Sequence, residues 1–559
     1  MSKGWFKLGE WACALLLLSA ATAWAGDDGL WVFLHDKVDA GGQTHTWSES
    51  GVAHSRAAQD VPVSGKYIER LRATGATVRV SSRWLNAVSV NATVEQETLL
   101  RKLTFVRSVK RVRSLVRPVP LPLAGPPLAR LARQDSYGIS FEQLAQVGII
   151  QLHQQGFTGD GVRIAVIDNG FHYTDHRAFD QKLNVVAQRD FVNGDEFVAD
   201  EIEQPTTGDE TRSTQNLHGA QVLSIMAAYD PGRFMGVAPD AEYILAKTED
   251  NASELPIEED RWIAGLEWAD SLGADVVNSS LGYNLWDTGE SYEYADLDGQ
   301  TTLTSVAAAM AVERGMVVVV AAGNEADVPW HYITAPGDAE GVITVGSVDV
   351  PVGVTRPPLI ANSSSRGPTA DGRIKPDVVA PGQGVIVADL RGGDYLRSSG
   401  TSFAAPMVSG ICALLLQANP HWGPEEVLES LRSTALDLGE AGPDTLYGWG
   451  QVDALAASGI EVLAPGNTAI MAPFPNPARV GSVYFPLLVN QREEVELSVF
   501  DTAGNLVFKR DWSLLAGVYT QAANAPRWEM EANTASGLYF YRVRSASLDQ
   551  AGTIAVVRR

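Results

Sequence analysis

VRIAVID, residues 162–168, is a short run of mostly apolar residues that ends on an aspartate. A nearly continuous apolar run of this length is typical of a strand that is buried on both faces of a sheet. Four further runs of the same kind follow it along the chain: AEYILAKT (241–248), ADVVNSSLG (274–282), MVVVVAAGN (316–324) and GVITVGSV (341–348). Segments with helical spacing lie between them, at 219–229, 260–273 and 303–315. The alternation predicts an α/β domain with a mostly parallel sheet and helices on both of its faces.

Polar residues that could take part in catalysis lie where these predicted elements begin or end. In a parallel sheet, reacting groups gather at the carboxyl ends of the strands. Asp168 and Asn324 each end a strand run, and His218 comes directly before a predicted helix. Ser402 lies in SSGTSFAAPMVSGICALLL (398–416), where glycine and hydroxyl residues lead into an apolar helix. Ser or Thr at such a start commonly only caps the helix, and Pro is tolerated there.

These four residue types together are the set that hydrolysis by a serine requires. An imidazole takes the proton of the serine hydroxyl, and a carboxylate fixes the ring and stabilises its charged form. An amide and a backbone N–H can bind the oxyanion. Taken singly, each residue is more often a cap or a turn, so the prediction depends on all four occurring together.

The motifs around these residues identify a known family by resemblance. AVIDNG (165–170), HGA (218–220), AAGN (321–324) and GTSFAAP (400–406), in this order, resemble the subtilisin-like serine peptidases, or subtilases. The resemblance covers about residues 136–458. It also includes GVAPDAEYILAK (236–247), SSLG (279–282), SSRGP (364–368), DVVAPG (377–382) and YGWGQVDA (447–454).

The resemblance implies a serine endopeptidase that hydrolyses peptide bonds in proteins through an acyl-enzyme. Asp168, His218 and Ser402 would form the catalytic triad, and Asn324 would be the oxyanion donor. Ser280, Leu281 and Gly282 would form the strand that binds an extended substrate, a mode of recognition based on backbone hydrogen bonds.

Two departures from the family pattern limit what the resemblance implies. Ala220 stands where Thr is usual, and a small residue still fits there. Asp230-Pro231-Gly232 predicts a tight turn in place of a longer calcium-binding loop. The acidic stretch 193–203 could supply oxygen ligands to calcium, but a solvated acidic face is the favoured interpretation. We therefore predict no cofactor and no metal site, with calcium left as an alternative.

The flanking segments predict a preproprotein. Residues 1–25 have the features of a signal peptide, with an uncleaved anchor as the alternative. Residues 26–115 predict a small α+β propeptide, and 116–135 a Pro-rich linker, with cleavage between Arg113 and Ser136. The catalytic domain would span 136–458. Residues 466–559 predict a small β-sandwich, which resembles the C-terminal sorting modules of type IX secretion cargo or is a plain accessory domain.

Charge and cysteine content restrict the partners. The net charge of −24 argues against nucleic acid and anionic membranes. Cys13 lies in the predicted signal, so Cys412 alone remains and no intrachain disulfide forms. We expect protein or peptide substrates, the propeptide acting in cis, and a contact with secretion machinery through the C-terminal domain. The mature protein would have no membrane span and would be secreted or held at the surface of a Gram-negative bacterium. The rival interpretations are a non-catalytic peptide-binding protein and a processing protease of narrow specificity.

Overall fold

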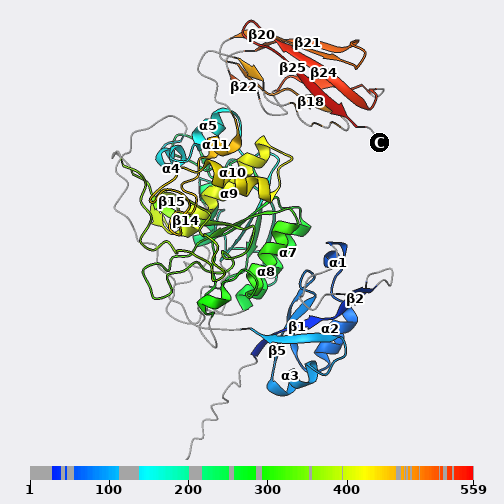
Figure 1. Ribbon diagram of the computed structural model, residues 1–559, viewed down its shortest axis with the longest axis vertical. Coiled ribbons are helices and arrows are strands. Elements are labelled where there is room, and N and C mark those ends of the chain that lie inside the picture. Colours follow the sequence, from blue (N-terminus) through cyan, green and yellow to red (C-terminus); the bar gives the residue numbers. More distant parts are fainter. Residues whose placement is uncertain are drawn as a thin grey trace, which may run out of the picture. The chain divides into compact units, whose positions relative to one another are not determined.

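The computed structural model divides the chain into two compact units, residues 1–112 and 113–559 (Figure 1). The predicted signal segment and the Pro-rich linker lie outside the described residues. The structure describes residues 28–38, 44–46, 56–112, 137–174, 176–199, 217–250, 257–284, 292–351, 356–392, 394–460, 468–470, 473, 476, 478, 481–489, 492–514, 517–519, 525–531 and 534–557.

The N-terminal unit is an α+β module, as the sequence predicts. Its four-stranded antiparallel sheet has the order β4-β5-β1-β6. Leu71 of α2 and Leu100 of α3 share one apolar cluster with Leu30 and Val32 of β1, so both helices cover the same face of the sheet. The elements are β1 (Asp28–Leu34), β2 (Asp36–Val38), β3 (Thr44–Thr46), α1 (Arg56–Asp60), α2 (Gly65–Arg72), β4 (Thr77–Ser82), β5 (Ala87–Ala92), α3 (Val94–Leu100) and β6 (Val106–Arg111).

The second unit contains the predicted α/β domain, built on an eight-stranded sheet. The strand order is β16-β15-β14-β13-β12-β7-β11-β8, and every neighbouring pair is parallel except β15 with β16. All five predicted strand runs are present. The strands are β7 (Arg163–Asp168), β8 (Asn184–Asp190), β11 (Glu242–Lys247), β12 (Val276–Ser279), β13 (Val317–Ala321), β14 (Ile343–Asp349), β15 (Val378–Asp389) and β16 (Asp394–Ser399).

Helices cover both faces of this sheet. Ser279 of β12 accepts a hydrogen bond from Trp262 of α7, whereas its neighbour Asn278 accepts one from Ser409 of α9. Successive side chains of a strand point to opposite faces, so α7 and α9 lie on opposite sides. The helices of the domain are α4 (Phe141–Ala145), α5 (Ile149–Gln154), α6 (Leu217–Ala227), α7 (Ile257–Ser271), α8 (Leu303–Glu313), α9 (Thr401–Ala418), α10 (Pro424–Thr434) and α11 (Ala454–Ser458).

Helix α9 is the central helix of the domain. By length and composition it is the one described helix that could cross a membrane, but 83% of it is buried inside the protein. Its residues Val408, Ile411 and Leu415 belong to the large apolar cluster that also contains α6 and the sheet. Cys412 is fully buried in the same helix, and burial raises the pKa of its thiol. Cys412 is therefore a small core residue, as predicted.

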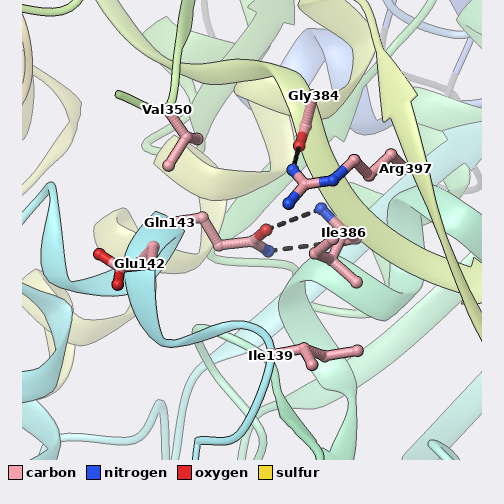
Figure 2. A pocket seen from close by; sticks show the side chains of 7 residues that line it. All are labelled: Ile139, Glu142, Gln143, Val350, Gly384, Ile386 and Arg397. Atoms are coloured by element: carbon pink, nitrogen blue, oxygen red, sulfur yellow. Dashed lines mark hydrogen bonds between the residues drawn. The ribbon is translucent and has the colours of Figure 1, made fainter. Parts of the chain in front are cut away.

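The sequence did not predict three strands of the sheet, β8, β15 and β16, which lie toward its two margins. β8 is one edge, and β16 runs antiparallel along the other. Helix α4 is attached beside β15, where the Gln143 amide accepts from the N–H of Ile386 at 2.8 Å and donates to its carbonyl at 3.2 Å (Figure 2). Strand β16 ends at Ser399 and is followed directly by Gly400 and the start of α9.

The C-terminal region is β-rich, as predicted. A four-stranded antiparallel sheet, β21-β20-β24-β25, shares one apolar cluster with shorter strands. The run SVYFPLLV (482–489) forms two short strands that are separated at Pro486, which has no N–H to donate to a ladder. The strands are β17 (Ala469–Ile470), β18 (Ser482–Tyr484), β19 (Leu487–Val489), β20 (Glu493–Phe500), β21 (Leu506–Leu514), β22 (Gly517–Tyr519), β23 (Arg527–Glu529), β24 (Gly537–Arg544) and β25 (Asp549–Val556).

Candidate active site

Asp168 is the last residue of β7, and its side chain is fully buried. Strand β7 lies inside the sheet between β11 and β12; Asp168 itself pairs with Lys247 of β11, and the β12 ladder ends at the preceding residue, Ile167. Its Oδ1 accepts from the N–H of Asn169 at 2.8 Å and from Nδ1 of His218 at 2.7 Å. The sheet therefore sets the position of the carboxylate, and the carboxylate sets the position of the imidazole ring.

His218 lies in the first turn of α6, and its side chain is 31% exposed. Because Nδ1 donates to Asp168, Nε2 carries the lone pair and can accept a proton. The close approach of α6 to the end of β7 depends on Gly219. A Cβ at that position would overlap the carbonyl oxygen of Gly170 and would lie 3.0 Å from Cβ of Asp168. Ala220, the departure from the family pattern, is completely buried, so a small residue does fit there.

Two opposing effects act on the pKa of His218. Burial lowers the pKa, because it penalises the charged ring. The negative charge of Asp168 and its hydrogen bond raise the pKa, and together they outweigh burial, so the net shift is upward. The ring is therefore a stronger base than an ordinary histidine.

Ser402 lies in the first turn of α9 and is partly exposed. The backbone reaches it through Gly400, whose φ of 151° and ψ of 156° are accessible essentially only to glycine. The hydroxyl of Ser402 donates to the carbonyl of Ser280 at 3.1 Å, and among the described contacts it makes no hydrogen bond to His218. The ring of His218 contacts the next residue, Phe403, with ring centroids 5.7 Å apart.

Asn324 lies just beyond β13, and its side chain is held by hydrogen bonds from Thr401, the first residue of α9. Its Oδ1 accepts from the N–H of Thr401 at 3.0 Å and from the Thr401 hydroxyl at 3.3 Å. With the oxygen held in this way, the Nδ2 group is left as the donor of the amide. The sequence reasoning missed Thr401, and the signal that could have found it is the hydroxyl residue directly before Ser402 in GTSFAAP.

Ser280, Leu281 and Gly282 follow the end of the β12 ladder, which closes at Ser279. Beyond them, Tyr283 exchanges two backbone hydrogen bonds with Ala335. Residues 280–282 are thus held at both ends, by the β12 ladder at Ser279 and by the pair Tyr283–Ala335, and Ser280 contacts the start of α9. Ser280 is linked to Ser402 in both directions, since its own hydroxyl donates to the Ser402 carbonyl at 2.8 Å.

Comparison with known proteins identifies the family of this chain. The profile of the subtilase family of S8 peptidases matches residues 159–450. The chain belongs to the subtilase family. A second profile, that of the S8 propeptide domain of Bacteroidota, matches residues 30–120 of this subtilase. The chain is thus a subtilisin-like serine endopeptidase with an N-terminal propeptide.

Individual relatives agree with the family profile. Subtilisin E of Bacillus subtilis (strain 168) is 33% identical over 330 residues, which are 58% of this subtilase and 72% of subtilisin E. Subtilisin of Bacillus pumilus is 32% identical over 330 residues, covering 58% of this subtilase and all of that protein. Serine protease AprX of Bacillus subtilis (strain 168) is 31% identical over 321 residues, covering 54% and 66% of the two chains.

The subtilase family needs no organic cofactor, and the described residues bear on whether a metal ion binds. Among them, no group of three or more His, Cys, Asp or Glu side chains is placed to hold a metal ion. Asp230 does begin a tight hairpin, with the Arg233 N–H donating to its carbonyl at 2.9 Å. The carboxylate of Asp230 lies 2.8 Å from the guanidinium of Arg177 and accepts from the hydroxyl of Tyr395 at 2.8 Å. Its charge is already compensated, so this turn does not fit a cation.

Proposed function

We propose that this subtilase is a secreted endopeptidase of broad specificity, with Asp168, His218 and Ser402 as its triad. The observation that carries the proposal is the 2.7 Å hydrogen bond between Asp168 and Nδ1 of His218, beside the first turn of α9, which contains Ser402. That bond leaves Nε2 of His218 to act as the general base.

In the proposed reaction, the Ser402 hydroxyl leaves the Ser280 carbonyl and turns to His218. Its oxygen attacks the substrate carbonyl carbon while Nε2 of His218 takes the proton. Asp168 stabilises the resulting imidazolium. His218 then returns the proton to the leaving amine, the peptide bond breaks, and an ester to Ser402 remains. Water, activated in the same way by His218, hydrolyses this ester and restores the hydroxyl.

Negative charge on the substrate oxygen would be bound by Asn324 and by the start of α9. Nδ2 of Asn324 and the N–H of Ser402 are the two proposed donors, and the positive end of the α9 dipole adds to them. The extended substrate would pair with Ser280–Gly282, which supports broad specificity because backbone hydrogen bonds carry little sequence information.

The flanking regions complete the proposal. The N-terminal unit would inhibit the catalytic domain in cis until cleavage between Arg113 and Ser136. It carries 13 Lys or Arg against 8 Asp or Glu over 28–115, which favours docking on an acidic enzyme. The Bacteroidota profile supports a Gram-negative source and an extracellular location. The C-terminal β-region would engage the secretion machinery, with an accessory role as the alternative.

Turnover of casein by the purified protein, beside the Ser402→Ala variant, tests the catalytic proposal. We expect no turnover by Ser402→Ala and normal turnover by Ser399→Ala, which changes an exposed serine three residues away. Equal activity of Ser402→Ala and the unmodified protein would remove Ser402 from its role. Mass spectrometry of the secreted protein tests the processing, where we expect a mature N-terminus between Arg113 and Ser136. Loss of the region 466–559 would support a sorting module, and its retention an accessory domain.

A further inference from the structure

A chain of polar side chains runs through the apolar core beneath Ser402. Ser409 of α9 and Asn278 of β12 are both fully buried, and Ser280 is 5% exposed. The hydroxyl of Ser409 donates to Oδ1 of Asn278 at 2.8 Å and lies 3.1 Å from the Ala405 carbonyl of its own helix. Nδ2 of Asn278 donates to the Ser280 hydroxyl at 3.1 Å, and that hydroxyl donates to the Ser402 carbonyl at 2.8 Å.

The carbonyl at the end of this chain is available because of Pro406. In an α-helix the carbonyl of residue 402 accepts from the N–H of residue 406, four positions later. Residue 406 is a proline inside α9, and proline has no N–H to donate. The Ser280 hydroxyl takes the place of the missing donor. The helix that carries the nucleophile is thus bonded, at the nucleophile itself, to the strand that would bind substrate.

The chain of hydrogen bonds fixes the direction of each donor. Ser409 holds the oxygen of the Asn278 amide, so the amide nitrogen points to Ser280. The Ser280 oxygen receives that N–H, which leaves its single proton for the Ser402 carbonyl. The Ser402 hydroxyl in turn donates to the Ser280 carbonyl at 3.1 Å. Both the nucleophile and the first residue of the substrate strand are therefore held in one relative placement.

Stability alone does not explain such a network. Burying an amide and a hydroxyl costs free energy that their hydrogen bonds only offset, and an apolar pair of similar volume is often as stable or more so. What a directional network supplies, and an apolar contact does not, is a defined distance and orientation between two elements.

We propose that Asn278, held by Ser409, is a positioning residue for catalysis. It acts through the Ser280 hydroxyl and sets the placement of Ser402 relative to the substrate-binding strand. The inference rests on the proposed function. A nucleophile displaced from its productive position loses turnover far more than substrate binding, so kcat should fall while KM changes little.

The main variant is the double substitution Asn278→Leu/Ser409→Ala, which removes both buried polar partners together. We expect kcat to fall by about 10- to 100-fold, with KM within about threefold and an unchanged or higher Tm. The rate of labelling by a fluorophosphonate should fall with kcat. This rate reports the reactivity of Ser402 when no peptide is bound along Ser280–Gly282. Ser409→Ala alone leaves the bond from Asn278 to Ser280 and should have a smaller effect.

The matched control is Ser279→Ala, on the same strand but on its opposite face. Ser279 is fully buried and accepts one hydrogen bond, from Trp262 at 2.9 Å. Loss of the Ser279 hydroxyl should lower Tm and leave kcat and the labelling rate unchanged. All proteins are full-length and are matured with a trace of the unmodified enzyme, and Ser402→Ala treated identically gives the background activity.

The outcomes separate the two proposals. Native kcat and native labelling in a folded Asn278→Leu/Ser409→Ala variant would overturn the positioning role. If that variant does not fold, Ser280→Ala decides, because it removes only the hydroxyl that contacts Ser402; native kcat there would also overturn the inference. If the unmodified enzyme itself is not labelled, the proposed catalytic role of Ser402 is what fails.

Discussion

Replacement of Asn324 by alanine tests the proposed oxyanion site most directly. The Oδ1 atom of Asn324 is held by the N–H of Thr401 at 3.0 Å and by its hydroxyl at 3.3 Å, so Nδ2 is the group available to a substrate oxygen. Loss of one such donor raises the barrier by about 2.7–4 kcal/mol, which is about a 10²- to 10³-fold fall in kcat. KM should stay near its native value, because the donor acts mainly on charge that develops in the transition state.

The assay is the measurement of kcat and KM on a chromogenic peptide, together with Tm. Thr401→Val is the graded comparison, since it removes the hydroxyl and keeps the backbone N–H that also binds Oδ1. One net hydrogen bond is worth about 0.5–1.5 kcal/mol, so kcat of Thr401→Val should fall by about 10-fold at most.

Three results would contradict this reasoning. Values of kcat and KM for Asn324→Ala that are both within about threefold of native would show that Asn324 does not stabilise the transition state. A rise in KM at constant kcat would show that the amide binds the substrate and its transition state equally well. A larger loss in Thr401→Val than in Asn324→Ala would mean that Thr401 acts by another route than through the amide.

Three further substitutions probe the base, the packing around it and a buried acid. Asp168→Asn should lower kcat by about 10⁴. Burial alone then acts on His218, so the pKa that governs kcat/KM should move from above 6.5 to below it; an unchanged pH–rate profile would contradict this. Gly219→Ala should lower fluorophosphonate labelling by about 100-fold, because the new Cβ overlaps the Gly170 carbonyl and displaces the start of α6; native labelling would show that α6 accommodates it. Burial, partly opposed by the hydroxyls of Tyr292 and Thr304, raises the pKa of Glu259 to about 8. The stability that the neutral carboxyl contributes is therefore complete below its ordinary pKa of 4.5 and lost as pH rises to about 8. Glu259→Gln, in a Ser402→Ala background that prevents autolysis, should raise Tm above pH 8 and lose this advantage near pH 4.5, and equal Tm curves at all pH values would refute the assignment.

The strands that the sequence predicted are those buried on both faces. Every residue of β13 is apolar, and β7 is apolar from Ile164 to Ile167, so a continuous run stands out from its surroundings. β15 did not stand out, because VVAPGQGVIVAD contains a proline and two glycines that are typical of turns. β8 lies at the edge of the sheet and β16 is its antiparallel margin, and both mix polar with apolar residues.

The candidate site was predictable in its residue types and not in its contacts. Asp168, His218, Asn324 and Ser402 could be singled out because each lies at an element end beside glycine or small residues. Asn278 gave no such signal, because one polar residue inside a strand has no special spacing to Ser409, 131 positions later. Their hydrogen bond exists only because β12 and α9 pack together, and this tertiary contact could not be predicted from the residue pattern. The catalytic roles of the four residues stay predictions until the variants are measured.

The start of α9 is hydrogen-bonded to the residues that follow two different strands. The N–H of Thr401 donates to Asn324 beyond β13, and the carbonyl of Ser402 accepts from Ser280 beyond β12. These strands are neighbours in the sheet, with Ser279 opposite Val320. The distance between the proposed oxyanion donor and the substrate strand is therefore set by the register of two parallel strands. A core substitution that slightly displaces β12 relative to β13, with the register kept, should lower kcat before it lowers Tm, since such a displacement costs little folding free energy but misaligns both ends of the site.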